Sequence, residues 1–389
     1  MKKFAETLQK TMWIALLLFL NATCTETFEF EAEEFENILV IEGNITDEVG
    51  PKEIRLSRTF LSGEESITES GAQVVVEDDQ GVAYTFQEQE PGRYISELEF
   101  GASAGRSYTL KLNTTDGDSY SSSPVSLPAS ARIERLEAVR TTKDGEDGVA
   151  IVVNSAGDNA EPSFYRYAYE ETYKIVTFYN PSKELLVVSE SPPVIEIVDK
   201  TREEQICFKT ILSNSIAIAN SSNFEENSIS DFQIRFIKRL SRLVTDRYSI
   251  LVTQFSQSRE ANTFYKNLKE FSSIESLFSQ TQPGFITSNI SSEADPDEKV
   301  LGFFEITSVS SQRIFFDFQD IFGNATRFFP DCDILDPSPS DADLVKLLND
   351  GTFDYASELP SGAPLVAPIA CVDCNVLGTN VVPDFWEDE

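Results

Sequence analysis

Hydrophobic and polar residues alternate along several short segments in the first third of the chain. The pattern is clear in residues 38–46, ILVIEGNIT, and in residues 52–60, KEIRLSRTF, where Ile54 and Leu56 share one face. A period of two is typical of a β-strand with one buried face. Because the turn sequence DEVGP separates the two segments, we expect two neighbouring strands.

The alternation continues to about residue 128, with turn residues between the segments. Asp79, Gln80 and Gly81 separate two more strands, and Asp116-Gly117 is a strong hairpin signal. Many short strands at regular spacing indicate an immunoglobulin-like antiparallel β-sandwich over residues 38–128. The Ser- and Pro-rich residues 121–130 predict a domain boundary.

Strand patterns resume beyond this boundary and dominate the rest of the chain. They include ARIERLEAV from residue 131, the aromatic segment 164–179 and the segment 247–255. We expect VLGFFEITSV (300–309) and QRIFFDF (312–318) to form a hairpin. The sequence therefore predicts a mainly β protein whose second domain, residues 131–389, is larger and mostly β, with a few short helices.

Two segments change to helical periodicity. In residues 258–271, apolar side chains recur three and four positions apart, which predicts an amphipathic helix. These side chains are Ala261, Phe264, Tyr265, Leu268 and Phe271. A second short helix is expected over residues 340–349, with Ser340 as its N-cap and Gly351 beyond its end.

The N-terminus resembles an export signal that ends at a cysteine. Basic residues precede a short apolar core, residues 13–20, which cannot span a bilayer as a helix. We interpret residues 1–23 as a lipoprotein signal peptide and Cys24 as the site of lipid attachment. An ordinary secretory signal is the alternative. Residues 24–37 would then be an acidic tether between the lipid and the folded part.

The formal net charge of −34 disfavours a broad surface that binds nucleic acid or anionic lipid head groups. The chain contains no histidine, which excludes histidine-dependent catalysis by this chain acting alone. Carboxylate-only chemistry, as in glycosidases, stays open, but no catalytic pair can be selected among 65 acidic residues. We therefore assign no catalytic residue.

Three acidic segments invite a calcium interpretation: residues 144–148, 293–299 and 340–350. None has the ligand spacing of an EF-hand loop, so we interpret them as solvated loops. No metal site and no cofactor are expected.

Four cysteines remain after Cys24, which is an even set suited to disulfides in an oxidising compartment. They are Cys207, Cys332, Cys371 and Cys374. The Cys371-x-x-Cys374 motif also permits a redox pair or part of a zinc site. We expect Cys207 and Cys332 each to pair with one tail cysteine, because long bridges constrain the unfolded chain more than a closed CxxC loop.

Several segments together resemble the Bacteroidota lipoproteins grouped as domain of unknown function 4249. The matching pieces include ILVIEGNITDEVGPKEIRLSRT, the CFK around Cys207, RYSILVTQFSQSREANTFYKNL, VLGFFEITSVSSQRIFF and the tail CVDCNVLGTNVVPDFW. They extend from Ile38 to Trp386 and so cover nearly all of the mature chain.

The resemblance implies an outer-membrane lipoprotein without established activity, often encoded beside a TonB-dependent transporter. Acidic residues soon after the lipidated cysteine resemble a surface-export signal, which implies an anchored protein that faces the cell exterior. These residues are Glu26, Glu29, Glu31, Glu33, Glu34 and Glu36.

The leading functional hypothesis is a non-enzymatic accessory or ligand-binding protein. Its expected partners are the TonB-dependent transporter and the outer membrane, to which lipid on Cys24 would attach it. Nucleic acid is not an expected partner. A carboxylate-based hydrolase and an adhesin or structural surface protein are the alternatives.

Overall fold

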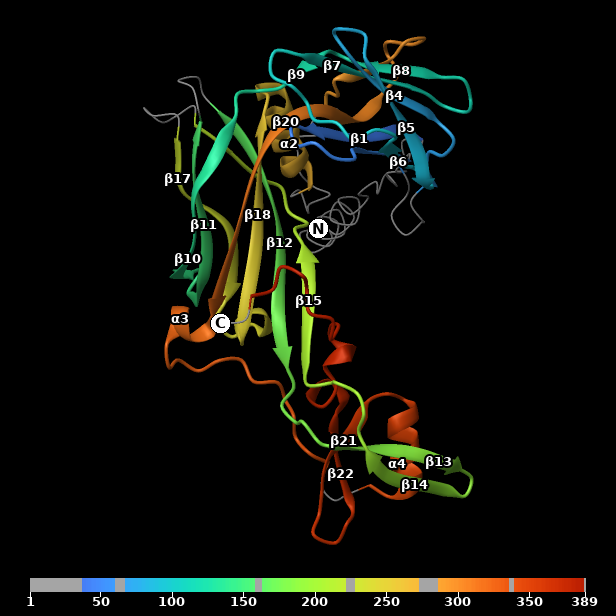
Figure 1. Cartoon of the computed structure of the whole chain (residues 1–389), viewed down its shortest axis with the longest axis vertical. Coiled ribbons are helices and arrows are strands. Elements are labelled where there is room, and N and C mark those ends of the chain that lie inside the picture. The colour runs from blue at the N-terminus through green and yellow to red at the C-terminus, as the bar shows by residue number, and fades with distance from the viewer. Residues whose placement is uncertain are drawn as a thin grey trace, which may run out of the picture.

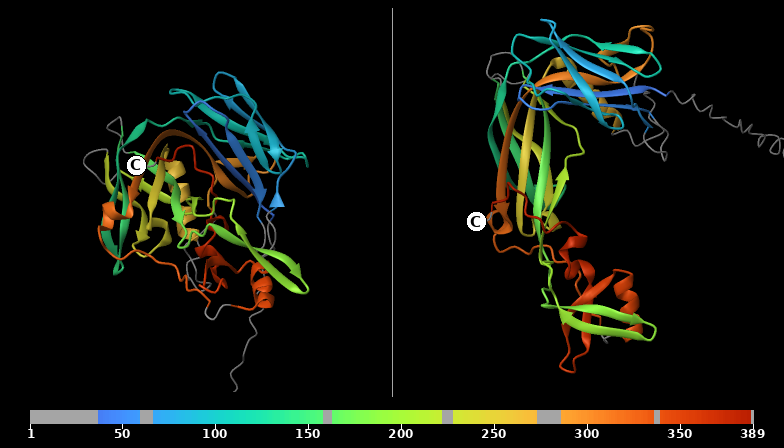
Figure 2. Two further views of the ribbon diagram at one scale, coloured as in Figure 1. Left: turned by 60° about the horizontal axis from the view of Figure 1, so that its bottom comes forward. Right: turned by 45° about the vertical axis from the view of Figure 1, so that its right-hand side comes forward.

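The chain forms three parts that follow one another along its long axis (Figures 1 and 2). We call them the N-terminal unit, the central sandwich and the terminal lobe. The computed structural model describes residues 37–59, 67–157, 163–221, 228–272, 286–335 and 339–387. The predicted signal peptide, Cys24 and the acidic tether up to residue 36 lie outside the described residues.

The N-terminal unit is one sheet that curls around a single core. Its strands follow the spatial order β20-β1-β2-β6-β5-β4-β7-β8-β19. Ile54 and Leu56 lie in the core, as their alternation predicts. The strands are β1 (Leu39–Thr46), β2 (Glu53–Arg58), β3 (Ile67–Thr68), β4 (Gln73–Asp78), β5 (Ala83–Glu90), β6 (Arg93–Ser96), β7 (Ser107–Asn113), β8 (Ser119–Ser122), β9 (Val125–Ser126), β19 (Ile290–Ser292) and the first half of β20 (Val300–Asp317).

Residues 38–128 do not complete this unit by themselves. β19 pairs with β8, and the first half of β20 pairs in parallel with β1. Ile290, Phe304 and Ile306 thereby enter the same core as the strands at the N-terminus. Local alternation cannot reveal a pairing between segments so far apart in sequence, so the sequence-based boundary at residue 128 misses this contribution.

The central sandwich consists of two sheets that pack against each other around a second core. One sheet contains β10 (Ala131–Lys143), β11 (Glu146–Gly157) and β17 (Ser228–Lys238). The facing strands are β12 (Phe164–Val176), β15 (Ile206–Leu212), β16 (Ala217–Asn220), β18 (Arg247–Gln257) and the second half of β20. The 3-10 helix η1 (Arg242–Val244) precedes β18, and helix α3 (Phe318–Phe322) follows β20. The described chain is thus mainly β, as predicted.

The predicted hairpin at residues 300–318 is wrong, because these residues form the single 18-residue strand β20. Val300 to Thr307 pair with β1, and Ser308 to Asp317 pair with β18. In Figure 1, β20 runs in orange from the N-terminal unit to α3 along β18. The intervening Ser310-Ser311 sequence contains no glycine, proline or asparagine that would favour a tight turn, and each half of the strand has its own partner. One continuous strand therefore connects the two units.

Both predicted helices are confirmed. Helix α2 (Arg259–Ser272) follows β18, and helix α4 (Asp341–Asn349) begins after Ser340, whose side chain accepts a hydrogen bond from the Asp343 N–H. No helix among the described residues has the length and apolar character needed to cross a membrane.

The terminal lobe lies at the far end of the molecule from the N-terminal unit (Figures 1 and 2). Two hairpins and α4 build it, namely β13 (Lys183–Glu190) with β14 (Pro193–Asp199), and β21 (Phe353–Glu358) with β22 (Pro364–Pro368). The short helices η2 (Ile369–Cys371) and η3 (Cys374–Val376) lead back toward the central sandwich.

Two disulfides stabilise this return of the chain. Cys207 pairs with Cys374, and Cys332 pairs with Cys371, so the predicted pairing of each distant cysteine with one tail cysteine is confirmed. The two cysteines of the CxxC motif have different partners, so they form neither a redox pair with each other nor a thiolate zinc site. Beyond them, Trp386 packs edge-on against Phe208 and Phe315 of the central sandwich.

Candidate ligand-binding site

A pocket of about 730 Å³ lies where the N-terminal unit, helix α2 and the central sandwich meet. Strands β1, β2 and β20 supply one wall, α2 supplies another, and β12 and β18 contribute the base. This volume is in the range of pockets that enclose small organic ligands.

Strand alternation explains why the N-terminal unit presents this wall. Ile41 and Ile45 of β1 point into the core of the unit, whereas the intervening Glu42 and Asn44 face outward and line the pocket. On β20, Phe304 enters that core, while its neighbour Phe303 packs on α2. One strand therefore stabilises the N-terminal unit with one face and forms the pocket with the other.

A glycine permits the close approach of β20 to β1 at this wall. Gly302 has φ of +99°, and a Cβ atom there would lie 1.9 Å from the Ile41 carbonyl oxygen. Since other residues rarely adopt this backbone conformation, Gly302 is required by the local geometry.

The walls are mostly apolar and rich in aromatic rings. Phe264 of α2 packs against Phe303, with ring centroids 5.2 Å apart. The apolar lining further includes Phe255, Leu268, Ile286 and Leu301. The amphipathic pattern of α2 thus serves both to attach the helix to the N-terminal unit and to provide an apolar wall.

A charged pair with several hydrogen bonds lies at the base of the pocket. The Arg166 Nη2 atom lies 2.6 Å from the Glu305 Oε1 atom, and the Glu305 side chain is only 1% exposed. Gln257 Nε2 donates to Glu305 Oε2 over 2.7 Å, and the Tyr265 hydroxyl donates to Glu305 Oε1 over 3.1 Å. The two carboxylate oxygens accept three hydrogen bonds, which offsets much of the cost of burying the charge.

Aromatic rings enclose the cation of this pair. The Arg166 guanidinium carbon lies 4.4 Å from the ring centroid of Phe255 and 4.7 Å from that of Tyr265. Burial alone would lower the pKa of Arg166, but the charge of Glu305 leaves that pKa above its ordinary value. Burial, reinforced by Glu305, also raises the pKa of Tyr265, so its hydroxyl stays a neutral hydrogen-bond donor. The cluster is therefore charged but internally balanced at physiological pH.

Further charged groups line the rim, and most of them have partners. Lys52 Nζ donates to Thr46 Oγ1 over 2.7 Å and to the Glu48 carbonyl oxygen. Burial lowers the pKa of Lys52, while Glu48 and Asp47 oppose that shift. Elsewhere on the rim, Glu53 forms ion pairs with Arg55 and Arg93.

Glu42 differs from its neighbours on the rim. Its exposed carboxylate has no hydrogen bond or ion pair within the part of the chain that the structure describes. Its charge adds a small contribution to the raised pKa of Tyr265, which also lines the pocket. Glu42 is thus a lining charge that a ligand could neutralise.

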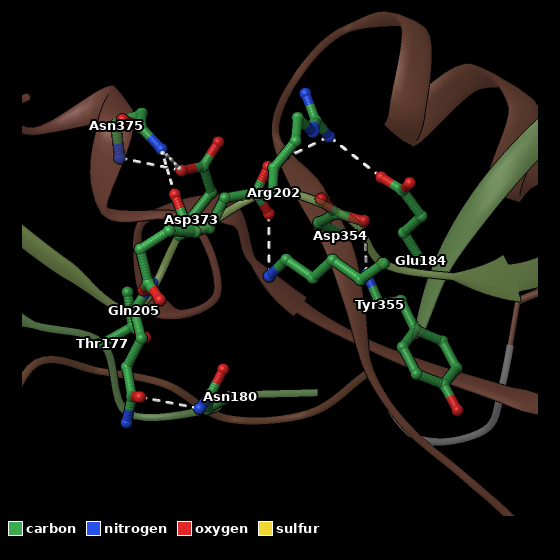
Figure 3. A network of polar contacts seen from close by, with 12 residues as sticks. Thr177, Asn180, Glu184, Arg202, Gln205, Asp354, Tyr355, Asp373 and Asn375 are labelled. Atoms are coloured by element: carbon green, nitrogen blue, oxygen red, sulfur yellow. Dashed lines mark hydrogen bonds and ion pairs between the residues drawn. The ribbon is translucent and has the colours of Figure 1, made fainter. Parts of the chain in front are cut away.

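A second polar cluster joins the terminal lobe to the central sandwich (Figure 3). Glu204 forms ion pairs with Lys200 over 2.7 Å and with Arg202 over 3.0 Å, and Arg202 also reaches Glu184. The Cys374 N–H donates to the Glu204 carbonyl oxygen, so the cluster adjoins one of the disulfides.

This cluster contains the kind of acidic grouping that a carboxylate-based hydrolase would need. Burial raises the pKa of Asp354; the Tyr355 N–H opposes the rise and Glu204 adds to it. However, the Glu204 and Lys200 side chains are only 3% and 6% exposed, and two cations neutralise Glu204. The arrangement is suited to holding the lobe in place rather than to contacting a substrate.

The acidic segments noted in the sequence have structural roles. Asp147, near the start of β11, pairs with Arg140 and Arg239. Glu298 accepts a hydrogen bond from the Tyr120 hydroxyl over 2.6 Å. Among the described residues, no group of three or more acidic or cysteine side chains has the arrangement of a metal site.

Sequence patterns did not reveal the charged base of the pocket, formed by Arg166 with its partner Glu305, or the role of Tyr265 in it. A signal was present at Glu305, which is the only charged residue in the mostly apolar segment VLGFFEITSV. A charge within a buried strand requires a partner, but the sequence does not reveal that this partner is Arg166 on β12.

Comparison with curated proteins gives no match to this chain. A family model described as "Domain of unknown function (DUF4249)" matches residues 25–313, which include the N-terminal unit, most of the central sandwich and every residue named as lining the pocket. The chain therefore belongs to the DUF4249 family.

Proposed function

We propose that this protein is a lipid-anchored binding protein of the outer membrane. It captures a small, largely apolar ligand in the pocket between the N-terminal unit and the central sandwich, and works with a TonB-dependent transporter. The observation that carries this proposal is the pocket of about 730 Å³, with its aromatic walls and buried polar base. Such a combination of apolar surface and few polar groups is common in ligand-binding sites.

The position of the pocket supports a role in capture and release. Its walls belong to two units, which β20 and α2 connect. A ligand there would contact both units at once, so binding would favour one relative orientation of them. A transporter that contacts either unit could thereby distinguish the loaded from the empty protein.

The N-terminal sequence supports the anchor. Cys24 follows a signal-like segment, and the acidic tether provides a link between a lipid and the folded part. The acidic residues of that tether favour export to the outer face. Replacing Cys24 with alanine is expected to abolish labelling by radioactive palmitate and to release the protein from the membrane fraction. Digestion of the protein by protease added to intact cells would support the external location, and full protection would contradict it.

Ligand capture is tested with the neutral fluorescent probe N-phenyl-1-naphthylamine. The complete mature chain, residues 24–389, carries Cys24→Ser so that no lipid competes for the probe. Leu268→Trp or Leu301→Trp fills the pocket from opposite walls and should weaken probe binding by about tenfold or more. Leu212→Trp, at an exposed position on β15, is the matched control.

An unchanged probe affinity in both filled variants would contradict ligand binding in this pocket, provided that their circular dichroism spectra match that of the parent protein. The partnership is tested by purification from native membranes. Recovery without any outer-membrane barrel would contradict the transporter role, whereas glycan hydrolysis lost on a single Asp or Glu substitution would favour the hydrolase alternative.

A further inference from the structure

We infer that the pocket prefers a cationic amphiphile: an apolar body that carries one ammonium group, held with that group near Glu42. This inference deepens the proposed function and rests on it. The charges that line the pocket, the aromatic walls and the overall field of the protein each support it.

The cations that line the pocket already have partners. Arg166 is neutralised by Glu305, and Arg55 is paired with Glu53. Lys52 donates to two oxygen atoms and lies near Asp47 and Glu48. An anionic ligand would therefore have to compete with partners that these cations already have.

Glu42 offers the opposite situation. It lines the pocket, and the described chain provides it with no ion pair or hydrogen bond. Beside an apolar wall, the carboxylate is less screened than on an open surface, so an ammonium group placed there gains more from the pair than it would in bulk water.

The aromatic walls add to this preference. The pocket already holds one cation between aromatic rings, since Arg166 lies against Phe255 and Tyr265. Phe264 and Phe303 line the same space, and aromatic faces attract an ammonium group but not a carboxylate. The long apolar body of the ligand would occupy the region bounded by Leu268, Ile286 and Leu301.

The charge of the whole protein acts in the same direction. With a formal net charge of −34, the protein concentrates cations near its surface and repels anions. Long-range attraction alone would act on any cation, so the specific role of Glu42 must be separated from the general field by a control that changes net charge elsewhere.

A matched series of competitors tests the inference. Decylamine, decanol and decanoate have the same chain length and differ in charge at pH 7.5. Each compound is titrated as a competitor of N-phenyl-1-naphthylamine bound to the mature chain carrying Cys24→Ser, at concentrations below micelle formation. We expect decylamine to compete best and decanoate worst.

Substitutions assign the preference to the pocket. Glu42→Gln should weaken the binding of decylamine about fivefold, as expected for an exposed ion pair, and leave the binding of decanol unchanged. Glu196→Gln is the matched control, because Glu196 is exposed on β14 in the terminal lobe and the substitution changes net charge equally. This control substitution should leave the affinities for all three competitors unchanged.

The outcomes separate this inference from the function on which it rests. If decanol competes as well as decylamine, or if Glu42→Gln and Glu196→Gln have equal effects, the cationic preference is overturned while the pocket stands. If decanoate competes best, the preference is reversed. If the probe does not bind the parent protein at all, both the capture function and this inference fail.

Discussion

Removal of the negative charge of Glu305 should destabilise the protein strongly, because the Arg166 cation would be left buried without its partner. The two side chains are 1% and 17% exposed and lie 2.6 Å apart. Breaking a buried ion pair by changing one member costs about 3–5 kcal/mol. Since two aromatic rings still face Arg166, we expect the lower end, about 3 kcal/mol, for Glu305→Gln.

The hydrogen-bond geometry indicates why glutamine is not a neutral replacement. Glu305 uses both oxygens as acceptors, for Arg166 and Tyr265 on one and for Gln257 on the other. A glutamine amide would place a donor against at least one of these donors, which loses a further hydrogen bond worth about 1 kcal/mol. Arg166→Met combined with Glu305→Met should therefore be less harmful than Glu305→Gln alone, because it removes both charges.

Trp386 provides the assay. The sequence contains two tryptophans, and Trp13 lies within the predicted signal peptide, so Trp386 is the only one in the mature chain. Its ring packs against Phe208 and Phe315, so its fluorescence in a urea titration follows the unfolding of the central sandwich.

An exposed ion pair is the control for this measurement. Arg135 and Asp231 lie 3.2 Å apart, with side chains 52% and 68% exposed. Asp231→Asn should change the free energy of unfolding by no more than about 0.5 kcal/mol. The reasoning is refuted if Glu305→Gln costs as little as this control.

Three further predictions concern the disulfides, the buried tyrosines and the polar cluster of the terminal lobe. Replacing Cys207 and Cys374 by serine opens a bridge of sequence separation 167 and should cost up to about 5 kcal/mol by loop entropy, measured by Trp386 fluorescence in urea. Burial is the main cause that raises the pKa of Tyr248 and Tyr265, so the unfolded chain loses these phenol protons first. The urea midpoint should therefore fall as pH rises above about 10, and unfolding at such pH should add a further step to the tyrosinate absorbance at 295 nm. The raised pKa of Asp354 means that ionisation of this carboxyl costs stability as pH rises through its folded value. Asp354→Asn should consequently raise the thermal midpoint at pH 8, and this gain should shrink at pH 4; a loss at pH 8 would contradict the assignment.

The segments that the sequence predicted well are those whose burial follows a local period. Alternation in β1 and β2 and the three-and-four spacing of α2 depend only on which side of each element meets an apolar core. The sequence also favoured bridges between each distant cysteine and one tail cysteine, because long bridges constrain the unfolded chain more, but two such pairings stayed open. By contrast, the two strand-like patterns in residues 300–318 suggested a hairpin, although the segment is one continuous strand with a different partner for each half.

The sequence alone determined the mainly β character, the two helices and the absence of histidine chemistry, since these follow from local periodicity and composition. Which tail cysteine each distant cysteine meets was decided by the tertiary structure. Only the tertiary structure decided that β20 belongs to two units and that Arg166 meets Glu305 across 139 residues. The physical reason is that a strand pattern specifies which face is buried but not against which partner. The pocket requires β20 to pair with both β1 and β18 and Arg166 to meet Glu305, so no local pattern could predict it.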